Sequence, residues 1–298
     1  MKVKLISTFC FFFCFFLLLQ DDTFSQFKEK YNSLPDAKSI LGSVVSPEDG
    51  MGTACAKGGK FQRYEKGNIY YHPDVGAFEI HGAILEKYGQ LNWEKGFLGF
   101  PRTDELWTPN HSGRFQLFQG GNIYWRADLG AFEVHGKILG KYGDYKYEQG
   151  FLGYPLSDEL DPGDGRGRYQ RFEGGSIYWT PQTGAFVVRG AIFEKWGEYN
   201  WEKGFIGYPK MDETDPGDGK GRFQKFEGGQ IYWTPETGAH EVHGPIFDKW
   251  GMDGWQKGKL GYPVTDILDA PGKDAVYCEF EHGRIDWNPM DGVSVKYK

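Results

Sequence analysis

The chain has 298 residues, a formal net charge of −7, 17% aromatic residues and 44 glycines. No basic patch accompanies this charge, which argues against a nucleic-acid partner. Abundant aromatic residues and glycines are typical of many short strands joined by tight turns, and this composition excludes a disordered chain.

The first 25 residues have the layout of a secretory signal peptide. Lys2 and Lys4 form a basic start, Phe9 to Leu19 is apolar apart from its cysteines, and small residues around Ser25 offer a cleavage site. This apolar run is too short to span a bilayer, which needs roughly 20 residues. We therefore expect an exported protein, secreted or associated with a cell wall or matrix, with no segment inserted in a membrane.

One unit recurs along the rest of the chain with a period of 54 residues. Such a period is the signature of a repeat architecture. The opening aromatic residues of the units are Phe61, Phe115, Tyr169, Phe223 and Tyr277. The sequence thus predicts one repeat domain over residues 26–298, with full repeats at 59–112, 113–166, 167–220 and 221–274.

The two ends of this domain look like complementary halves of a repeat. Residues 26–50 match the second half of a unit, and residues 275–298 match the first half. Split halves favour a closed ring, in which one half completes the other and free sheet edges disappear. Cys55 and Cys278 fall at this seam, so in an exported protein they are expected to form a disulfide that locks the ring.

Within the third repeat, the pattern predicts three strands and one short helix. Strands at 169–173 and 176–179 flank a Gly-Gly hairpin turn, and a third strand follows at 185–188. A helix is expected at 191–196, with Gly197 capping its end. An ordered apolar loop then runs over 205–209.

That loop carries a family resemblance. Leu98-Gly99-Phe100-Pro101 is the signature of the LGFP repeat family, and near variants occur at 152–155, 206–209 and 260–263. The segment Leu41-Gly42-Ser43-Val44 departs from it, because it lacks the aromatic–proline pair. The resemblance implies a mainly β, propeller-like array of fivefold pseudo-symmetry with one short helix per repeat. It also implies a role similar to that of cell-wall attachment modules.

Recurring aromatic residues are the candidate ligand-binding groups. Neighbouring residues of a strand face opposite sides, so one ring of each Tyr-Trp pair faces the core and the other can face a glycan. The candidate glycan-stacking rings are Tyr70, Tyr124, Tyr178 and Tyr232, the first members of these pairs. A second set, in the loop after each helix, is Trp93, Tyr147, Trp201 and Trp255. The alternative, that these rings fill gaps between repeats, stays open, and the core is favoured for the second member of each pair.

Other recurring polar residues are given structural interpretations. His81, His135 and His243 share one register, but Arg189 occupies it in the third repeat and would repel a cation, so no metal site is expected. Turn chemistry explains the Asp-Pro-Gly-Asp-Gly loops without calcium. Adjacent carboxylates recur as Asp104-Glu105, Asp158-Glu159 and Asp212-Glu213 and are interpreted as solvated helix or turn ends. No acid, base and pocket assemble in one place, so we expect neither catalysis nor a cofactor.

The sequence therefore predicts a monomeric, non-catalytic module with several binding sites for cell-wall or extracellular polysaccharide. Several weak sites on one body gain affinity through effective concentration. A structural or matrix protein that binds other proteins is the alternative. A secreted glycan hydrolase is the least favoured hypothesis.

Overall fold

The computed structural model of the protein describes residues 25–46, 53–270 and 274–298. The predicted signal peptide, apart from Ser25, lies outside the described residues. None of the described helices is long and apolar enough to cross a membrane. The chain forms two compact units, one of residues up to Leu139 with Tyr154–Asp158, the other of Gly140–Gly153 with Glu159–Lys298.

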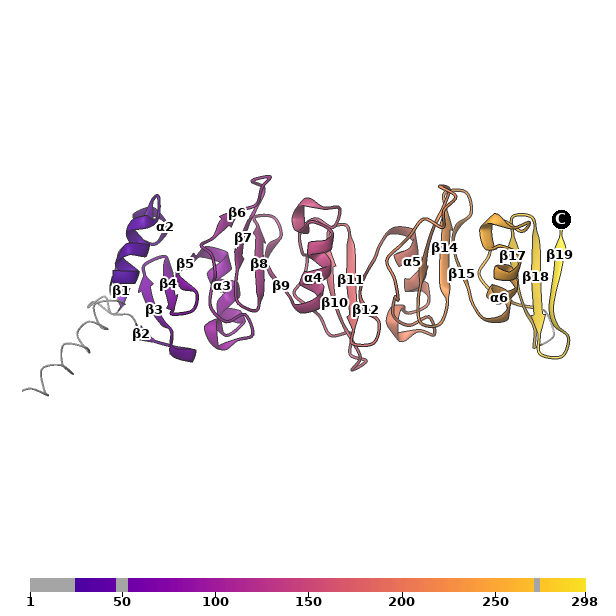
Figure 1. Ribbon diagram of the computed structural model, residues 1–298, viewed down its shortest axis with the longest axis horizontal. Coiled ribbons are helices and arrows are strands. Elements are labelled where there is room, and N and C mark those ends of the chain that lie inside the picture. The colour runs from indigo at the N-terminus through magenta and orange to yellow at the C-terminus, as the bar shows by residue number, and fades with distance from the viewer. Residues whose placement is uncertain (1–24, 47–52, 271–273) are drawn as a thin grey trace, which may run out of the picture. The chain divides into compact units, whose positions relative to one another are not determined.

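The first unit holds two antiparallel sheets (Figure 1). In one, the strand order is β1-β3-β4-β5 and β2 also pairs with β3; in the other it is β6-β7-β8-β9. The bounds are β1 Val44–Ser46, β2 Thr53–Ala54, β3 Lys60–Tyr64, β4 Gly67–His72, β5 Gly76–His81, β6 Leu106–Trp107, β7 Arg114–Leu117, β8 Gly121–Arg126 and β9 Gly130–His135.

The second unit holds three antiparallel sheets, each with its strands in sequence order. The bounds are β10 Arg168–Phe172, β11 Gly175–Thr180, β12 Gly184–Val188, β13 Arg222–Lys225, β14 Gln230–Thr234, β15 Gly238–Val242, β16 Leu268–Asp269, β17 Val276–Phe280, β18 Gly283–Asn288 and β19 Gly292–Tyr297. The predicted strands and hairpin turn of the third repeat are confirmed, because Phe172 pairs with Gly175 and Tyr169 with Tyr178.

One helix follows the meander of each full repeat. The helices are residues 25–33, α2 Ala37–Ile40, α3 Gly82–Gln90, α4 Gly136–Asp144, α5 Gly190–Glu198 and α6 Gly244–Met252. A 3-10 turn comes after each of the last four: η2 Trp93–Lys95, η3 Tyr147–Gln149, η4 Trp201–Lys203 and η5 Trp255–Lys257; η1 is Ala56–Gly58. Gly197 lies inside α5, and Tyr199 is the residue that ends it. The predicted glycine cap is therefore wrong, and Gly197 instead leaves room for the Trp201 ring.

Helices α3, α5 and α6 each pack against the sheet that follows them in the chain. In the first unit, α3 contacts β5 of one sheet and β8 and β9 of the next. Its Tyr88 is fully buried, with the ring edge-on to Tyr70 at 5.5 Å and against Phe118 at 4.9 Å between centroids. In the second unit, Trp196 of α5 lies in the same way between Tyr178 and Phe226. The packing unit is thus a helix with the sheet of the next repeat.

The Leu-Gly-aromatic-Pro loop fastens that unit together. Gly207 has a left-handed φ of +67°, and a Cβ there would collide with the Glu227 side chain from the next hairpin turn. Only glycine fits such a position. The Gly207 carbonyl accepts a hydrogen bond from Trp196 Nε1 at 3.1 Å, and the Tyr208 N–H donates to Glu227 Oε2 at 3.0 Å. Gly99, Gly153 and Gly261 share the positive φ and accept from Tyr88, Tyr142 and Trp250.

The N-terminal segment makes the same joint despite its altered motif. Gly42 has a φ of +76°, and its carbonyl accepts from the Tyr31 hydroxyl at 2.9 Å. The Ser43 N–H donates to Glu65 Oε2 at 2.9 Å, in the place of the aromatic residue's N–H. Phe27 and Leu41 pack with Tyr64 and Ile69 of the adjacent hairpin. Because the donor in this hydrogen bond is a backbone N–H, the contact forms without the aromatic–proline pair.

Half-buried lysine–aspartate pairs link repeats further apart in the sequence. Lys141 of α4 and Asp212 join at 3.0 Å, and Asp212 Oδ1 also accepts the Val187 N–H at 2.8 Å. Lys141 lies 5.4 Å from the centroid of the Phe186 ring. The equivalent pairs are Lys30–Asp104, Lys87–Asp158 and Lys195–Asp266. The expectation that these aspartates are solvated turn ends is therefore wrong, because each accepts a lysine and a strand amide.

The closed, propeller-like ring is not supported. Among the described residues the five sheets share no strand, and none closes on itself. The two sequence halves do not need each other, because the N-terminal half packs on β3 and β4 while β17–β19 pack with α6. The coarser prediction, a mainly β repeat array with one helix per repeat, is confirmed.

The predicted disulfide is also absent, since Cys55 and Cys278 are both free thiols. Cys278 is buried with Phe280 and Ile285, and its Sγ donates to the Thr265 carbonyl at 3.2 Å. Cys55 packs against a different cluster, around Tyr70. Each thiol thus has its own local packing, and burial raises the pKa of both.

We predict that Asp266→Asn lowers stability most at neutral pH and least in acid. Burial opposes ionisation of Asp266, but hydrogen bonds from His240, the Glu241 N–H and Lys195 hold its pKa well below the usual range. A carboxyl with a depressed folded pKa stabilises above its unfolded pKa, about 4, and this contribution is lost as the pH falls below it. Urea unfolding should show the variant to be less stable by ~2 kcal/mol at pH 7, with the gap narrowing as the pH falls from about 4 to about 2.

The exposed Asp269→Asn provides the matched control, because Asp269 lies on the surface of β16. A gap between wild type and Asp266→Asn that stays constant from pH 7 to pH 2 would contradict this account of the ion pair.

Candidate functional site

An aromatic residue in a left-handed backbone conformation follows each of the helices α3 to α6. Trp93, Tyr147, Trp201 and Trp255 have φ values of 48°, 54°, 49° and 51°. The preceding residue is left-handed as well, so two such residues occur in succession. Positive φ is rare for bulky side chains and costs on the order of 1–3 kcal/mol. Strain of this kind, repeated in four repeats, points to a constrained ring.

The helix holds that ring against a glycine. In α5, a Cβ added to Gly197 would lie 3.1 Å from the Trp201 indole, so the ring occupies the space that a side chain would take. Gly89, Gly143 and Gly251 have the same relation to Trp93, Tyr147 and Trp255. The four rings remain 40–46% exposed. They were predicted as one of two candidate sets, and they are the set that reaches solvent.

The other candidate set lies in the core. Tyr70, Tyr124, Tyr178 and Tyr232 are only 3–4% exposed. Each stacks on the aromatic residue opposite in the sheet, as Tyr178 does on Tyr169 at 5.1 Å, and burial raises the pKa of Tyr178. Their rings point toward the helix, whereas the second members of the pairs, such as Trp179, are half-buried. The predicted orientation of the pairs is therefore reversed, and replacing these tyrosines would test folding and not binding.

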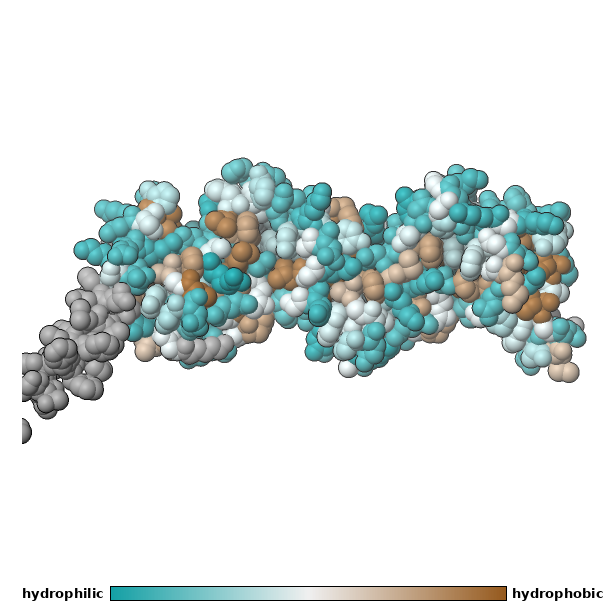
Figure 2. All heavy atoms as spheres, viewed as in Figure 1, coloured by the Kyte–Doolittle hydropathy of each residue, from teal (hydrophilic) through white to brown (hydrophobic). Residues whose placement is uncertain are grey.

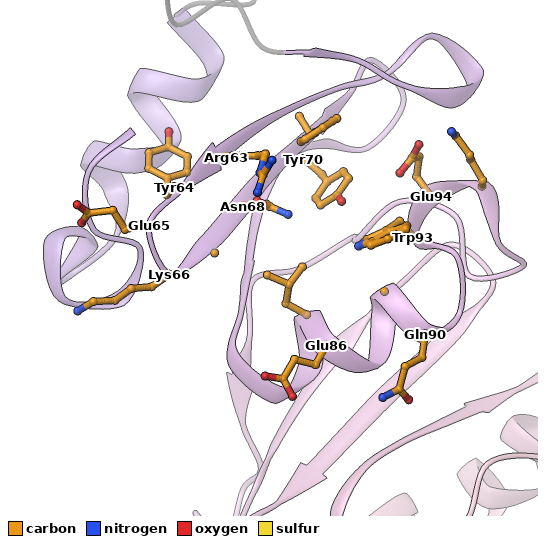
Figure 3. A pocket seen from close by; sticks show the side chains of 15 residues that line it. Arg63, Tyr64, Glu65, Lys66, Asn68, Tyr70, Glu86, Gln90, Trp93 and Glu94 are labelled. Atoms are coloured by element: carbon orange, nitrogen blue, oxygen red, sulfur yellow. The ribbon is translucent and has the colours of Figure 1, made fainter. Parts of the chain in front are cut away.

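A cleft opens between the exposed ring and the sheet. In the first full repeat it has a volume of about 1100 Å³ and is lined by Phe61, Arg63, Asn68, Tyr70, Trp93 and Glu94, among others (Figure 3). In the third repeat a cleft of about 520 Å³ is lined by the equivalent residues Tyr169, Arg171, Ser176, Tyr178, Trp201 and Glu202. The same cleft is thus built twice, from residues at the same positions of the repeat.

A shielded carboxylate accompanies the exposed ring. Glu94 and Glu148, each directly after the left-handed aromatic, are 4% and 8% exposed. Glu94 Oε1 accepts the Ala56 N–H at 3.3 Å. Burial raises the pKa of Glu148 and Glu202. Gln256 holds this position in the fourth repeat.

The recurrent histidines pair with buried glutamates. His81 Nδ1 lies 2.7 Å from Glu79 Oε2, and His243 Nδ1 lies 2.5 Å from Glu241 Oε1. Burial alone would lower the pKa of His81, but the glutamate hydrogen bond and nearby negative charge raise it. In the third repeat Val187 replaces the glutamate and Arg189 replaces the histidine. The glutamate partner of His81 and of His243 thus lies on the same strand as the histidine.

The Asp-Pro-Gly-Asp-Gly loops are closed by backbone hydrogen bonds. Asp215 Oδ1 accepts the N–H groups of Gly217 and Asp218, and Asp218 Oδ2 accepts the Tyr262 hydroxyl at 2.8 Å. Asp161 and Asp164 repeat this pattern with Gly163 and Tyr208. These bonds join each loop to the aromatic residue of the next signature loop.

Comparison with known families agrees with these repeated joints. The LGFP repeat family matches residues 41–96, 98–150, 152–204, 206–258 and 260–295. The chain belongs to the LGFP repeat family. The matched LGFP segments start at the signature loop and not at the hairpin. No curated protein matches the chain.

Solved structures add no argument for the LGFP repeats. Matches include the extracellular domain of BT4673 from B. thetaiotaomicron (11% identity, 87% of this chain and 30% of that chain, TM-score 0.17). The hemopexin fold protein CP4 from cow pea is 8% identical over 62% of this chain and 88% of that chain, TM-score 0.16. An inactive virginiamycin B lyase from Staphylococcus aureus is 11% identical over 82% of each chain, TM-score 0.15. The LGFP chain thus spans less than a third of the first of these.

The cleft residues other than the aromatic rings escaped the sequence analysis of these LGFP repeats. Glu94, Glu148 and Glu202 recur directly after the exposed ring, and this recurrence was the available signal. Arg63 and Arg171 recur two repeats apart on equivalent strands. A second missed set consists of exposed phenylalanines before the signature loop that contact a basic side chain: Phe97 with His135, Phe151 with Arg189 and Phe205 with His243.

We predict opposite outcomes for two glycine-to-alanine changes in the helices. Gly140 of α4 has open space at its Cβ position, so Gly140→Ala should raise the free energy of unfolding by up to ~1 kcal/mol through helix propensity. Gly197→Ala gains the same propensity but forces the Trp201 indole to move, so no such gain is expected. Thermal unfolding and tryptophan fluorescence measure both effects. Equal stabilisation with unchanged fluorescence would show that Gly197 does not position the ring.

Proposed function

We propose that this protein is an exported, monomeric, non-catalytic module that holds polysaccharide at several clefts along its repeats. The observation that carries the proposal is the exposed aromatic ring that four repeats keep in a strained left-handed conformation. An exposed, rigid ring offers a flat apolar face at low cost in conformational entropy. The apolar face of a sugar ring is a chemically suitable partner for it.

The polar groups of the cleft support a carbohydrate ligand. Glu94 and Asn68 stand beside the Trp93 and Tyr70 rings, and both can bond to sugar hydroxyls (Figure 3). Clefts with aromatic walls and a few polar groups are typical small-ligand sites. On the face drawn in Figure 2, apolar residues form small separate patches along the repeats. A broad protein-binding face would be expected to carry a larger continuous patch.

The contacts of the recurring aspartates favour a binding role over hydrolysis. Glycosidases need two carboxyl groups that flank one bond. Asp104, Asp158 and Asp212 each accept a lysine and a strand amide, so their oxygens are already occupied. Export rests on the predicted signal peptide of residues 1–25.

Several clefts on one chain would act together on a polymer. Linked weak sites raise overall affinity by roughly 10²–10⁴ when they engage at once. We therefore expect a single substitution, such as Trp201→Ala, to weaken retention on an insoluble polysaccharide only a few-fold. The combination Trp93→Ala, Tyr147→Ala, Trp201→Ala and Trp255→Ala should abolish it. Pull-down on a panel of polysaccharides and peptidoglycan measures the effect.

Trp107→Ala is the matched control, because Trp107 is equally exposed but lies on β6, outside the clefts. Circular dichroism should show all variants folded. Full retention of the folded quadruple variant would refute the clefts as binding sites. If the wild-type protein is retained on no polymer, the alternative of a matrix protein that binds other proteins is favoured.

A further inference from the structure

A further cavity lies beside the start of α6, and the exposed tryptophans do not line it. It has a volume of about 380 Å³, which is within the range of small-ligand sites. Its walls are formed by Lys210, by Lys225 with the hairpin turn that follows it, by His243, and by Phe247 of α6, whereas Trp255 is not among the residues that line it. This cavity is therefore distinct from the clefts that hold the exposed rings.

Two lysines of this cavity have no ionic partner. Lys210 and Lys225 form no ion pair with any of the described residues, although Lys210 attracts the Glu227 carboxylate electrostatically. Of the described residues that line the cavity, Glu227 alone is acidic. Its Oε1 accepts a hydrogen bond from Arg166 at 2.5 Å, and its Oε2 accepts the Tyr208 N–H at 3.0 Å. Since the one carboxylate is engaged by other donors, both lysines are available to a ligand.

A histidine adds a third basic group to the cavity. His243 Nδ1 lies 2.5 Å from Glu241 Oε1, and this hydrogen bond raises the pKa of His243 although burial opposes the shift. The His243 side chain is 39% exposed and that of Glu241 is 1% exposed, so the histidine is the member of the pair that a ligand can reach. The exposed Phe205 ring contacts the His243 ring, with 5.0 Å between their centroids. Basic groups and an apolar ring thus meet at this cavity.

The third repeat has a cavity at the corresponding place, but its charge is different. That cavity has a volume of about 360 Å³ and is lined by Arg189 and Gly190, which occupy the positions of His243 and Gly244. Arg189 pairs with Glu213 at 3.4 Å, and Glu213 lines the same cavity. No lysine is among the described residues that line it. The cation of this cavity is therefore already neutralised, whereas the lysines of the cavity beside α6 are not.

We infer that the cavity beside α6 binds an oxyanion, which is the sulfate, phosphate or carboxylate group of an acidic ligand. Lysine and protonated histidine donate N–H groups to anionic oxygens, and such charge-assisted hydrogen bonds are about twice as strong as neutral ones. A lysine ammonium acts as a point charge, so it accommodates oxyanions of different shapes. This site is additional to the aromatic clefts and does not depend on polysaccharide binding by them.

The charge of the whole chain makes a binding test specific. With a net charge of −7, the protein as a whole repels an acidic polymer at low salt. Binding to such a polymer therefore reports local contacts with cations and not general attraction.

The test compares one polymer with and without its charge. Binding of the full chain is measured by affinity electrophoresis in neutral dextran, dextran sulfate, phosphorylated dextran and carboxymethyl dextran, so that the arms distinguish the three oxyanions. Wild type is compared with Lys210→Gln/Lys225→Gln. The matched control is Lys220→Gln/Lys259→Gln, which removes two exposed lysines that do not line the cavity.

We expect wild type to bind at least one charged dextran more tightly than neutral dextran. The Lys210→Gln/Lys225→Gln variant should lose about tenfold affinity for that polymer, and the control variant should behave as wild type. Equal affinities of the two double variants, or no binding of wild type to any charged dextran, would overturn the inference. Retention on uncharged polysaccharides tests the aromatic clefts separately. Thermal unfolding of each variant verifies that it is folded.

Discussion

The backbone carbonyl of the left-handed glycine in each signature loop is the acceptor on which the repeat array depends. It receives the one polar group of the large aromatic residue buried in the helix, as Gly207 does from Trp196. Without that bond a buried indole N–H would lose its partner, at a cost of about 1–3 kcal/mol. The same glycine has no room for a Cβ because the next hairpin's glutamate packs against it. This one residue therefore joins the helix, the loop and the following hairpin.

The candidate clefts follow from the geometry of this contact between the helix, the signature loop and the next hairpin. The helix must end close to the signature loop, and the chain turns there through two left-handed residues, the second of which begins the 3-10 turn. The aromatic residue at the second of these positions lies across the helix glycine and cannot enter the core, which Tyr178 and Tyr169 already fill. Exposure of Trp201 thus follows from local backbone geometry, and the cost of its strain is met by the packing of the repeat around it. Rigidity of this kind would suit the proposed contact with a ligand, because the ring would not have to reorganise on binding.

Much of the fold could be read from the sequence, and the errors have identifiable causes. The 54-residue period, the hairpins and the helix follow from patterns within one repeat. The prediction of a closed ring was not supported because each repeat was taken to begin at its hairpin. In the structure, the helix of one repeat packs on the sheet of the next. The end segments that contain Phe27 and Tyr277 then look like complementary halves of one repeat. In the structure, each of them packs with the repeat next to it in the chain. The orientation of the Tyr-Trp pairs was also predicted wrongly. Alternation along a strand shows that Tyr178 and Trp179 point to opposite faces of the sheet, but it does not show which face the helix covers. Backbone strain at Trp93 leaves no mark in residue type, so the exposed set could be proposed but not selected.

The half-repeat offset of the packing unit has an evolutionary consequence. A closed ring fixes its number of blades, because one blade more or fewer breaks the geometry of all the others. Here each joint involves only a helix, a loop and the hairpin that follows, and every joint is built alike. A gene of this kind can gain or lose a 54-residue segment by unequal recombination and still encode a chain with intact joints. The number of repeats in such a protein can therefore change without any change in the residues of a single cleft.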